Sequence, residues 1–308
     1  MRDKALVKQN IKLFLEDLLL KDGLYTNVSV GELNPYFTDI SRLQPGDQVY
    51  PEPDFISSVP NRVFQSAFKN WVHEEGIPSP GSGIAPPTVA SGVTVGGTFY
   101  PTATTSGTFA HSVDFPNGRI IFTTPLAGTP IVQATFAYKE FGVDGANIFD
   151  NEKRPLLIET ALKDNPSVTG VIVYPSWDAR TLPLVLVDIL SRDNSAYELG
   201  TRAAVKDYFG VFHVWARDEF TCGHIEEIIS DEYRQVLLGI DFNSAPDPLL
   251  AFGAKNPNFP GYNTLATLWG PFFWRRIYLE ELSPQKDTPL YEVERSKVKF
   301  NIRVYPNF

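Results

Sequence analysis

The sequence is short of cysteine, and this excludes several ways of stabilising a protein or binding a metal. Cys222 is the single cysteine in 308 residues, so no disulfide can form within the chain. Stability must then come from packing or from other subunits. Cys222 and His224 are two ligands without a second pair, which falls short of a tetrahedral zinc site. We therefore expect no metal, and interpret the pair as a small helix residue beside a partly exposed histidine.

Positive charge is also scarce. The chain has 27 Lys and Arg against 36 Asp and Glu, which gives a net charge of -9. Because binding to a phosphate backbone depends on positive charge, we expect no sequence-specific nucleic-acid binding. The most apolar N-terminal segment, Leu6 to Leu20, is interrupted by four charged residues, so we expect no membrane span and no signal peptide. These features predict a protein folded in the cytoplasm without a membrane partner.

Familiar catalytic motifs are absent from the sequence. It contains no phosphate-binding Gly-x-x-x-x-Gly-Lys-Ser/Thr loop, no His-Glu-x-x-His helix, no dinucleotide-binding glycine motif and no Gly-x-Ser-x-Gly elbow. Adjacent carboxylates such as Glu226 and Glu227 diverge on a helix and do not converge on one reacting atom. The histidines are expected on separate elements: His73, His111, His213 and His224. We therefore predict no enzyme, no catalytic residue and no cofactor.

Helical periodicity is clearest at the N-terminus. Asp3 is a helix cap, Gly23 ends the helix, and the apolar residues between them form a broad stripe: Val7, Ile11, Phe14, Leu15 and Leu18. So wide a stripe predicts burial against the body of the protein or against a neighbouring subunit. A second helix is predicted at about Arg62 to Glu75, where Phe64, Phe68 and Trp71 are spaced at i, i+4 and i+7.

The middle of the chain changes to a period of two. Residues 78–91 are rich in Pro, Gly and Ser and form a linker, and Val132 to Tyr138 then alternates between two faces. Asn117-Gly118 predicts a tight hairpin, because both residues tolerate positive φ. The sequence therefore predicts three domains: residues 1–77 with N-terminal helices and an irregular connector, 78–148 as a small antiparallel β domain, and 149–308 as an α+β domain.

In the last of these domains the pattern predicts strands and helices in alternation. Helices are expected at about 154–163 and 218–233, the second capped by Asp218, and strands at 169–174, 184–190, 210–216 and 298–304. The cluster Trp269, Phe272, Phe273, Trp274, Arg275 and Arg276 has three readings: an oligomer interface, a loop that caps the core, and a carbohydrate-stacking surface.

Three consecutive stretches of the third domain resemble the core of tail-terminator and related neck proteins of tailed bacteriophages. They are Leu184 to Ile189, the turn Ala196 to Arg202, and Val211 to Asp218 with the helix that follows. In the turn, Gly200 permits a backbone bend, and Glu198 and Arg202 are available for pairing. Residues 111–138 are likewise similar to β modules of phage virion proteins. The resemblance covers about a third of the chain.

The resemblance implies a fold and a function. The implied fold is α+β, a tail-terminator-like antiparallel sheet flanked by helices, with an additional small antiparallel β domain and an N-terminal helix. The implied function is a structural component of the virion at the head–tail junction, either a neck or collar protein or a tail terminator. Its implied partners are identical copies in a ring, commonly a hexamer with a hole that could admit DNA, and other neck, connector or tail proteins. It would be assembled in the host cytoplasm and reside in the virion.

Two further expectations follow. We predict that the contact surfaces are the N-terminal helix face, Ile11, Phe14 and Leu18, and the aromatic cluster 269–276. The alternative function is a carbohydrate-binding component of a tail fibre or adhesin.

Overall fold

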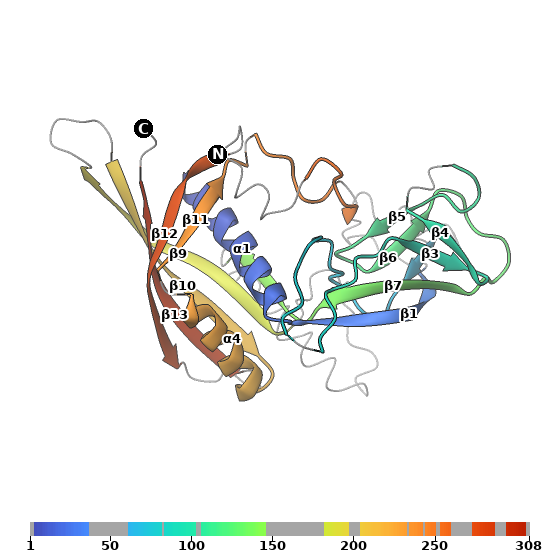
Figure 1. Cartoon of the computed structure of the whole chain (residues 1–308), viewed down its shortest axis with the longest axis horizontal. Coiled ribbons are helices and arrows are strands. Elements are labelled where there is room, and N and C mark those ends of the chain that lie inside the picture. The colour runs from blue at the N-terminus through green and yellow to red at the C-terminus, as the bar shows by residue number, and fades with distance from the viewer. Residues whose placement is uncertain are drawn as a thin grey trace, which may run out of the picture. The chain divides into compact units, whose positions relative to one another are not determined.

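The computed structural model describes residues 3–36, 61–81, 83–102, 106–145, 182–196, 204–232, 234–242, 244–250, 253–259, 273–286 and 294–305. Within these ranges lie thirteen strands and two helices, and the strands form two curled sheets (Figure 1). The chain divides into two compact units. Unit 1 comprises Met1–Asp22, Glu140–Ala245 and Tyr262–Phe308, and unit 2 comprises Gly23–Lys139 and Pro246–Gly261. The division into three consecutive domains, which the sequence predicts, stays a prediction.

Unit 2 is built on a seven-stranded antiparallel sheet in the order β4-β3-β7-β1-β2-β6-β5. Its strands are β1 (Tyr25–Tyr36), β2 (Val63–Gln65), β3 (Gly92–Val95), β4 (Thr98–Pro101), β5 (His111–Asp114), β6 (Arg119–Phe122) and β7 (Val132–Lys139). Phe64, Trp71 and Phe136 are fully buried at its core, and the Trp71 and Phe136 rings stack with centroids 3.9 Å apart. Such ring pairs stabilise a core beyond the area that they bury.

The hairpin predicted at Asn117-Gly118 is confirmed. β5 and β6 pair from His111 with Phe122 to Asp114 with Arg119. Gly118 has φ +62°, and a Cβ built there would lie 2.1 Å from the Phe68 carbonyl oxygen. Only glycine therefore meets both the backbone conformation and the close approach at this turn.

The second predicted helix, at about 62–75, is wrong. Val63–Gln65 is strand β2, Asn70 has φ +55°, and the Trp71 amide donates to the Phe115 carbonyl at 2.8 Å. Phe64 and Trp71 both reach the core from a segment that is not helical, so their helical spacing did not indicate a helix. Phe68 instead stacks on Tyr138, with centroids 4.4 Å apart. Pairing with distant strands has overridden the local pattern.

Unit 1 is built on a six-stranded sheet in the order β11-β12-β13-β10-β9-β8, in which only the β8–β9 pair among the described strands is parallel. Its strands are β8 (Gly142–Gly145), β9 (Leu184–Ala196), β10 (Ala204–Ala216), β11 (Gln235–Ile240), β12 (Phe273–Lys286) and β13 (Glu294–Val304). Both helices, α1 (Asp3–Lys21) and α4 (Glu219–Asp231), pack against this sheet.

Helix α1, predicted from the N-terminal stripe, is confirmed. Val7, Ile11 and Leu15 are fully buried on the side that contacts β8, β9, β11 and α4. A polar residue fixes the helix: the Asn10 side chain donates to the Ile240 carbonyl at 3.0 Å and accepts from the Ile240 amide at 2.7 Å. These two bonds give the Ile240 backbone, at the end of the edge strand β11, a buried side-chain partner.

The helix predicted at about 218–233 is also confirmed, as α4 (Glu219–Asp231). Asp218 is its N-cap and accepts from the Thr221 amide at 2.8 Å. Such a cap satisfies one of the amides that the first turn of a helix leaves free. The alternating strand predicted at 298–304 is part of β13, where Val298, Phe300 and Ile302 are buried.

A β-bulge interrupts the pairing of β9 with β10. Phe209 pairs with Ser191 and Gly210 with Ile189, which leaves Leu190 as the extra residue. Leu190 is 62% exposed and Phe209 43% exposed, so the bulge presents two apolar side chains to solvent. A Cβ on Gly210 would lie 2.3 Å from both the Asp188 oxygen and the Phe300 ring, so the backbones can approach this closely only because residue 210 is glycine.

The expected fold class is wrong. An α+β, tail-terminator-like sheet flanked by helices, with one small additional β domain, would make helices a main layer. Two curled sheets of seven and six strands dominate instead, and the described residues hold two helices. The error has one source in the aromatic segment 62–75. Another is in unit 2, where β1 and β2 extend the expected small β domain into a larger sheet. The predicted helix at 154–163 and strand at 169–174 lie outside the described residues.

Within the ranges that the structure describes, neither helix is both long enough and apolar enough to cross a membrane.

Candidate functional site

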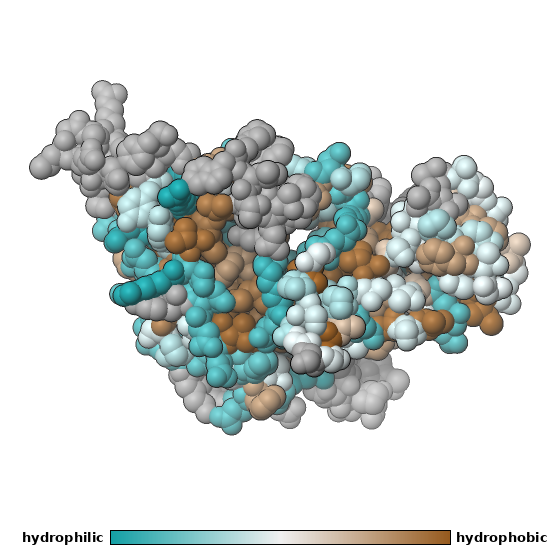
Figure 2. All heavy atoms as spheres, in the orientation of Figure 1, coloured by the Kyte–Doolittle hydropathy of each residue, from teal (hydrophilic) through white to brown (hydrophobic). Residues whose placement is uncertain are grey.

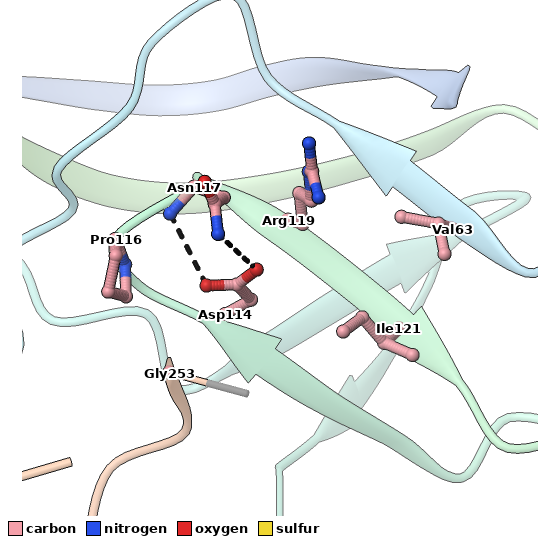
Figure 3. A pocket seen from close by; sticks show the side chains of 7 residues that line it. All are labelled: Val63, Asp114, Pro116, Asn117, Arg119, Ile121 and Gly253. Carbon is pink, nitrogen blue, oxygen red and sulfur yellow. Dashed lines mark hydrogen bonds between the residues drawn. The ribbon is translucent and has the colours of Figure 1, made fainter. Parts of the chain in front are cut away.

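The turn between β5 and β6 encloses a small pocket in unit 2 (Figure 3). Its volume is about 120 Å³ and it is lined by Val63, Asp114, Pro116, Asn117, Arg119, Ile121 and Gly253. The Asp114 carboxylate accepts from the Asn117 amide at 3.3 Å and from the Asn117 side chain at 2.9 Å. Figure 3 shows both bonds closing the turn from within.

The contacts of Asp114 indicate a structural role for this pocket. Burial raises the pKa of the Asp114 carboxyl, although the Asn117 bonds and nearby Arg119 act in the other direction. Gly253 has φ +73°, and a Cβ there would lie 2.4 Å from Asp114 Oδ1. The segment around Gly253 therefore packs directly on the turn, and the space left is on the scale of a few water molecules.

A larger cavity, of about 770 Å³, lies elsewhere in unit 2, and this size is in the range of small-molecule sites. We call it the histidine cavity because His73 and His111 both line it. Its other lining residues are Glu74, Glu75, Val89, Ala90, Ser91, Thr102, Ser112, Val113, Phe115, Pro248, Ala254, Lys255, Pro257 and Phe259. The chain brings these together from the segment after β2, from β5, from the residues before β3 and from the segment 248–259.

The first wall of the histidine cavity is a short segment held against β7. The Val72 amide donates to the Ala137 carbonyl at 2.8 Å, and the Lys139 amide donates to the Asn70 carbonyl at 2.8 Å. This pairing brings the Lys139 ammonium to 2.7 Å from Glu74 Oε1, with the two side chains 9% and 16% exposed. Burial acts to raise the pKa of the Glu74 carboxyl, but Lys139 and His73 outweigh it and hold the pKa below its usual range.

His73 lies beside this ion pair and stays neutral. Burial of the ring lowers its pKa from 6.5 to about 4, because the low-dielectric surroundings disfavour the charged imidazolium more than Glu74 favours it. Its Nε2 lies 3.5 Å from Glu74 Oε1. At neutral pH the carboxylate therefore has Lys139 as its charged partner, and the imidazole adds no charge to the cavity.

His111 forms a second wall and has one nitrogen without a partner. It is 8% exposed, its Nδ1 lies 2.9 Å from the Phe109 carbonyl, and its Nε2 has no hydrogen-bond partner within the protein. A carbonyl oxygen can only accept, so Nδ1 carries the proton and Nε2 is left with a lone pair. Burial lowers the pKa of this histidine as well, which keeps the ring neutral, and Nε2 itself is buried.

The other candidate ligands lie apart from the histidine cavity, in unit 1. Burial, with nearby Glu226 and Glu294, raises the pKa of the Cys222 thiol to about 11, so this cysteine is a poor nucleophile. His224 is exposed and lies 3.3 Å from Asp22, and His213 Nδ1 lies 3.2 Å from the Arg295 guanidinium. Among the described residues, no three His, Cys, Asp or Glu gather to hold a metal ion.

The predicted contact residues on α1 have different degrees of exposure. Ile11 is fully buried within unit 1, whereas Phe14 and Leu18 are half-buried and retain accessible surface. Leu13 is half-buried as well. Figure 2 shows hydrophobic residues gathered over α1 on the visible face of unit 1.

The predicted aromatic cluster is described only in part. Phe273, Trp274 and Arg275 are half-buried at the start of β12, Arg276 is exposed, and the Arg275 guanidinium lies 5.6 Å from the Trp274 ring centre. Trp269 and Phe272 lie outside the described residues, as do the turn residues Glu198, Gly200 and Arg202. The two contact surfaces stay predictions.

The sequence reading did not anticipate the histidine cavity. The sequence predicts His73 within the helix at 62–75 and His111 on a separate element, and no motif connects the two. The one local signal was the charged run His73-Glu74-Glu75 just after a buried tryptophan. No protein-family model matches this chain, and no curated protein matches it either.

Proposed function

We propose that the chain is a structural component of a tailed-phage virion at the head–tail junction, a neck or collar protein or a tail terminator, which assembles as a ring of identical copies. The observation that carries the proposal is the apolar surface that α1 retains. Leu6, Val7, Ile11 and Leu15 are buried, yet Leu13, Phe14 and Leu18 on the same helix are only half-buried. Helices that carry apolar residues on most sides are usually buried on most sides by other protein segments or subunits.

The bulge in β9 supports the same proposal. Leu190 and Phe209 lie next to each other in the β9–β10 pair and are largely exposed. Exposed apolar side chains that neighbour one another are typical of protein–protein contact surfaces. In a ring, the surface of one copy meets a different surface of the next copy, and α1 and the bulge are two candidate surfaces of this kind.

The order of elements also agrees with the proposal. The stretches that resemble phage neck proteins, 184–189, 211–218 and 225–229, form parts of β9, β10 and α4 in one unit.

The test is the mass and shape of the purified chain. Sedimentation and negative-stain microscopy are expected to show rings, and mass spectrometry of purified phage particles is expected to find the chain. Phe14→Ala and Trp274→Ala are expected to lower the mass of the oligomer, as is Phe209→Ser. Phe99→Ser, which alters an exposed side chain on β4 in unit 2, is the matched control. A strictly monomeric protein that is absent from finished particles would contradict the proposal.

A further inference from the structure

Unit 1 carries two complementary surfaces on opposite sides of its sheet. We propose that neighbouring copies of the chain associate through them: the exposed side of α4 on one copy docks across β9, β10 and β13 on the next copy. This contact rests on the ring proposed above and deepens it, because it names the surface that meets the bulge.

The position of α4 shows that the two surfaces face in opposite directions. α4 packs on the side of β13 that holds Ser296, whose hydroxyl donates to Glu226. Side chains alternate along a strand, so Lys299 and Asn301 lie on the other side of the sheet. Phe209 pairs with Asn301 and shares that side. Each copy can therefore meet one neighbour with α4 and another with the far side of the sheet, as association into a ring requires.

The far side of the sheet combines apolar and basic groups. Leu190 and Phe209 are largely exposed at the bulge, and Lys299 is exposed on β13. We call these three residues the bulge patch. The residues directly across from Lys299 are Val211 on β10 and Ser283 on β12, and neither carries a charge. The bulge patch therefore suits a partner that presents an apolar side chain beside a carboxylate.

The exposed side of α4 has this complementary chemistry. Phe220 is 84% exposed, and aromatic side chains are enriched in protein–protein interfaces. Gly223 and Glu227 follow it at i+3 and i+7, which places them on the same side of the helix, and both are exposed. We call these three residues the α4 ridge. It presents an aromatic ring, a gap without a side chain and a carboxylate, in that order.

Gly223 has no structural reason within its own chain. Glycine in the interior of a helix is destabilising relative to alanine. Gly223 is not among the glycines with positive φ, and a Cβ there would meet nothing within 4 Å. Neither its backbone conformation nor packing inside unit 1 requires glycine. A close approach from another molecule would require it, since only glycine leaves room for a ring against the helix backbone.

The spacings of the two surfaces agree. Successive residues of the α4 ridge are about 5 and 6 Å apart along the helix axis. Successive residues of the bulge patch lie on the adjacent strands β9, β10 and β13, which are about 5 Å apart. A helix laid across these strands places the ridge over the patch in order: Phe220 over Leu190, Gly223 over Phe209 and Glu227 over Lys299.

The experiment measures association of the full-length chain by analytical ultracentrifugation over a range of protein concentrations. Glu227→Lys and Lys299→Glu should each weaken association about tenfold, because each brings two like charges together. An equal mixture of the two variants should assemble as the parent does, since every contact in an alternating ring then joins opposite charges. Glu32→Lys makes the same change of charge at an exposed position of β1 in unit 2 and is the matched control.

Two further variants separate association from folding. In Gly223→Leu the new side chain meets nothing within the chain and favours the helix, so the unfolding temperature should stay the same or rise. Association should nevertheless weaken about tenfold, because the leucine holds Phe209 of the next copy away. Phe220→Ser should weaken association by a similar factor without lowering the unfolding temperature, since Phe220 is exposed in the single chain.

The outcomes distinguish this contact from the proposed function. If the parent forms rings and all four single variants form them equally well, the docking contact is wrong and the ring stands. Failure of the mixed charge variants to assemble would also contradict the contact. If the rings respond to these substitutions but the chain is absent from phage particles, the contact is supported and the virion role is wrong. A parent that stays monomeric would overturn the ring and the contact together.

Discussion

Asn10 and Ile240 are joined by two hydrogen bonds, of 3.0 and 2.7 Å, across 230 residues of sequence. The Asn10 amide is fully buried and also donates to the Leu6 carbonyl at 2.9 Å. One side chain therefore connects the middle of α1 to the backbone at the end of β11.

Asn10→Leu should destabilise unit 1 strongly. Leucine has a similar size but leaves the buried Ile240 amide and carbonyl without partners, at a cost of about 2–4 kcal/mol. Calorimetric unfolding measures the change. Lys4→Leu, at an exposed position of the same helix, is the control and should change stability by less than about 0.5 kcal/mol. Equal effects of the two variants would contradict the anchoring role.

Stability should fall between pH 6.5 and pH 4 because of His73. Its pKa is lowered from 6.5 to about 4 in the folded state, so the unfolded chain binds a proton in this window that the folded chain does not. The contribution is complete above pH 6.5 and is lost as the pH falls towards 4. Its size is about 3 kcal/mol over the window.

Urea unfolding of unit 2 at a series of pH values measures this slope. His73→Gln should reduce the slope without abolishing it, since burial also lowers the pKa of His111. A slope in His73→Gln as steep as in the parent would show that His73 is not the titrating group.

Lys139→Met should lower the free energy of unfolding, because it leaves the Glu74 carboxylate without its charged partner. Both side chains are mostly buried, so removing one partner should cost about 3 kcal/mol at pH 7. Because the ion pair holds the pKa of Glu74 down, its contribution is present above the unfolded value of 4.5 and is lost as the pH falls below it. The double variant Glu74→Gln with Lys139→Met should recover part of the loss, and the thermal midpoint of unit 2 is the readout. Additive losses would exclude the coupling.

Two glycines of unit 1 should respond in opposite ways to alanine. At Gly210 a Cβ would lie 2.3 Å from both the Asp188 oxygen and the Phe300 ring, so Gly210→Ala should cost about 3 kcal/mol. At Gly223, in the interior of α4, a Cβ meets nothing within 4 Å, so Gly223→Ala should stabilise by about 1 kcal/mol. Denaturant unfolding of the two variants side by side tests the sign, and a neutral Gly210→Ala would contradict the close packing at the bulge.

The sequence predicted the elements whose signals are local. Helix α1 follows from its apolar stripe, α4 from the cap at Asp218, and the β5–β6 hairpin from Asn117-Gly118. In each of these the residues that decide the structure lie within a few positions of one another.

Features that depend on distant pairing were not predictable in this way. Phe64, Phe68 and Trp71 have helical spacing, yet pairing of β2 with β1 and β6 holds the segment extended. Leu190 is a bulge residue only because of its register against Phe209 and Gly210. His73 and His111 line one cavity because of the order of strands in the sheet, which no short window of sequence contains.

The place of β13 in its sheet has a consequence for biosynthesis. β13 lies between β12 and β10, and it comes later in the chain than either neighbour. During translation, β10 and β12 each have one row of backbone amides and carbonyls that stays unsatisfied until residues 294–304 leave the ribosome. Nascent chains of this protein therefore carry one open strand edge, on β10, from residue 216 onward, and a second, on β12, from residue 286 onward. Such edges are the part of an incomplete sheet most prone to pair with other chains.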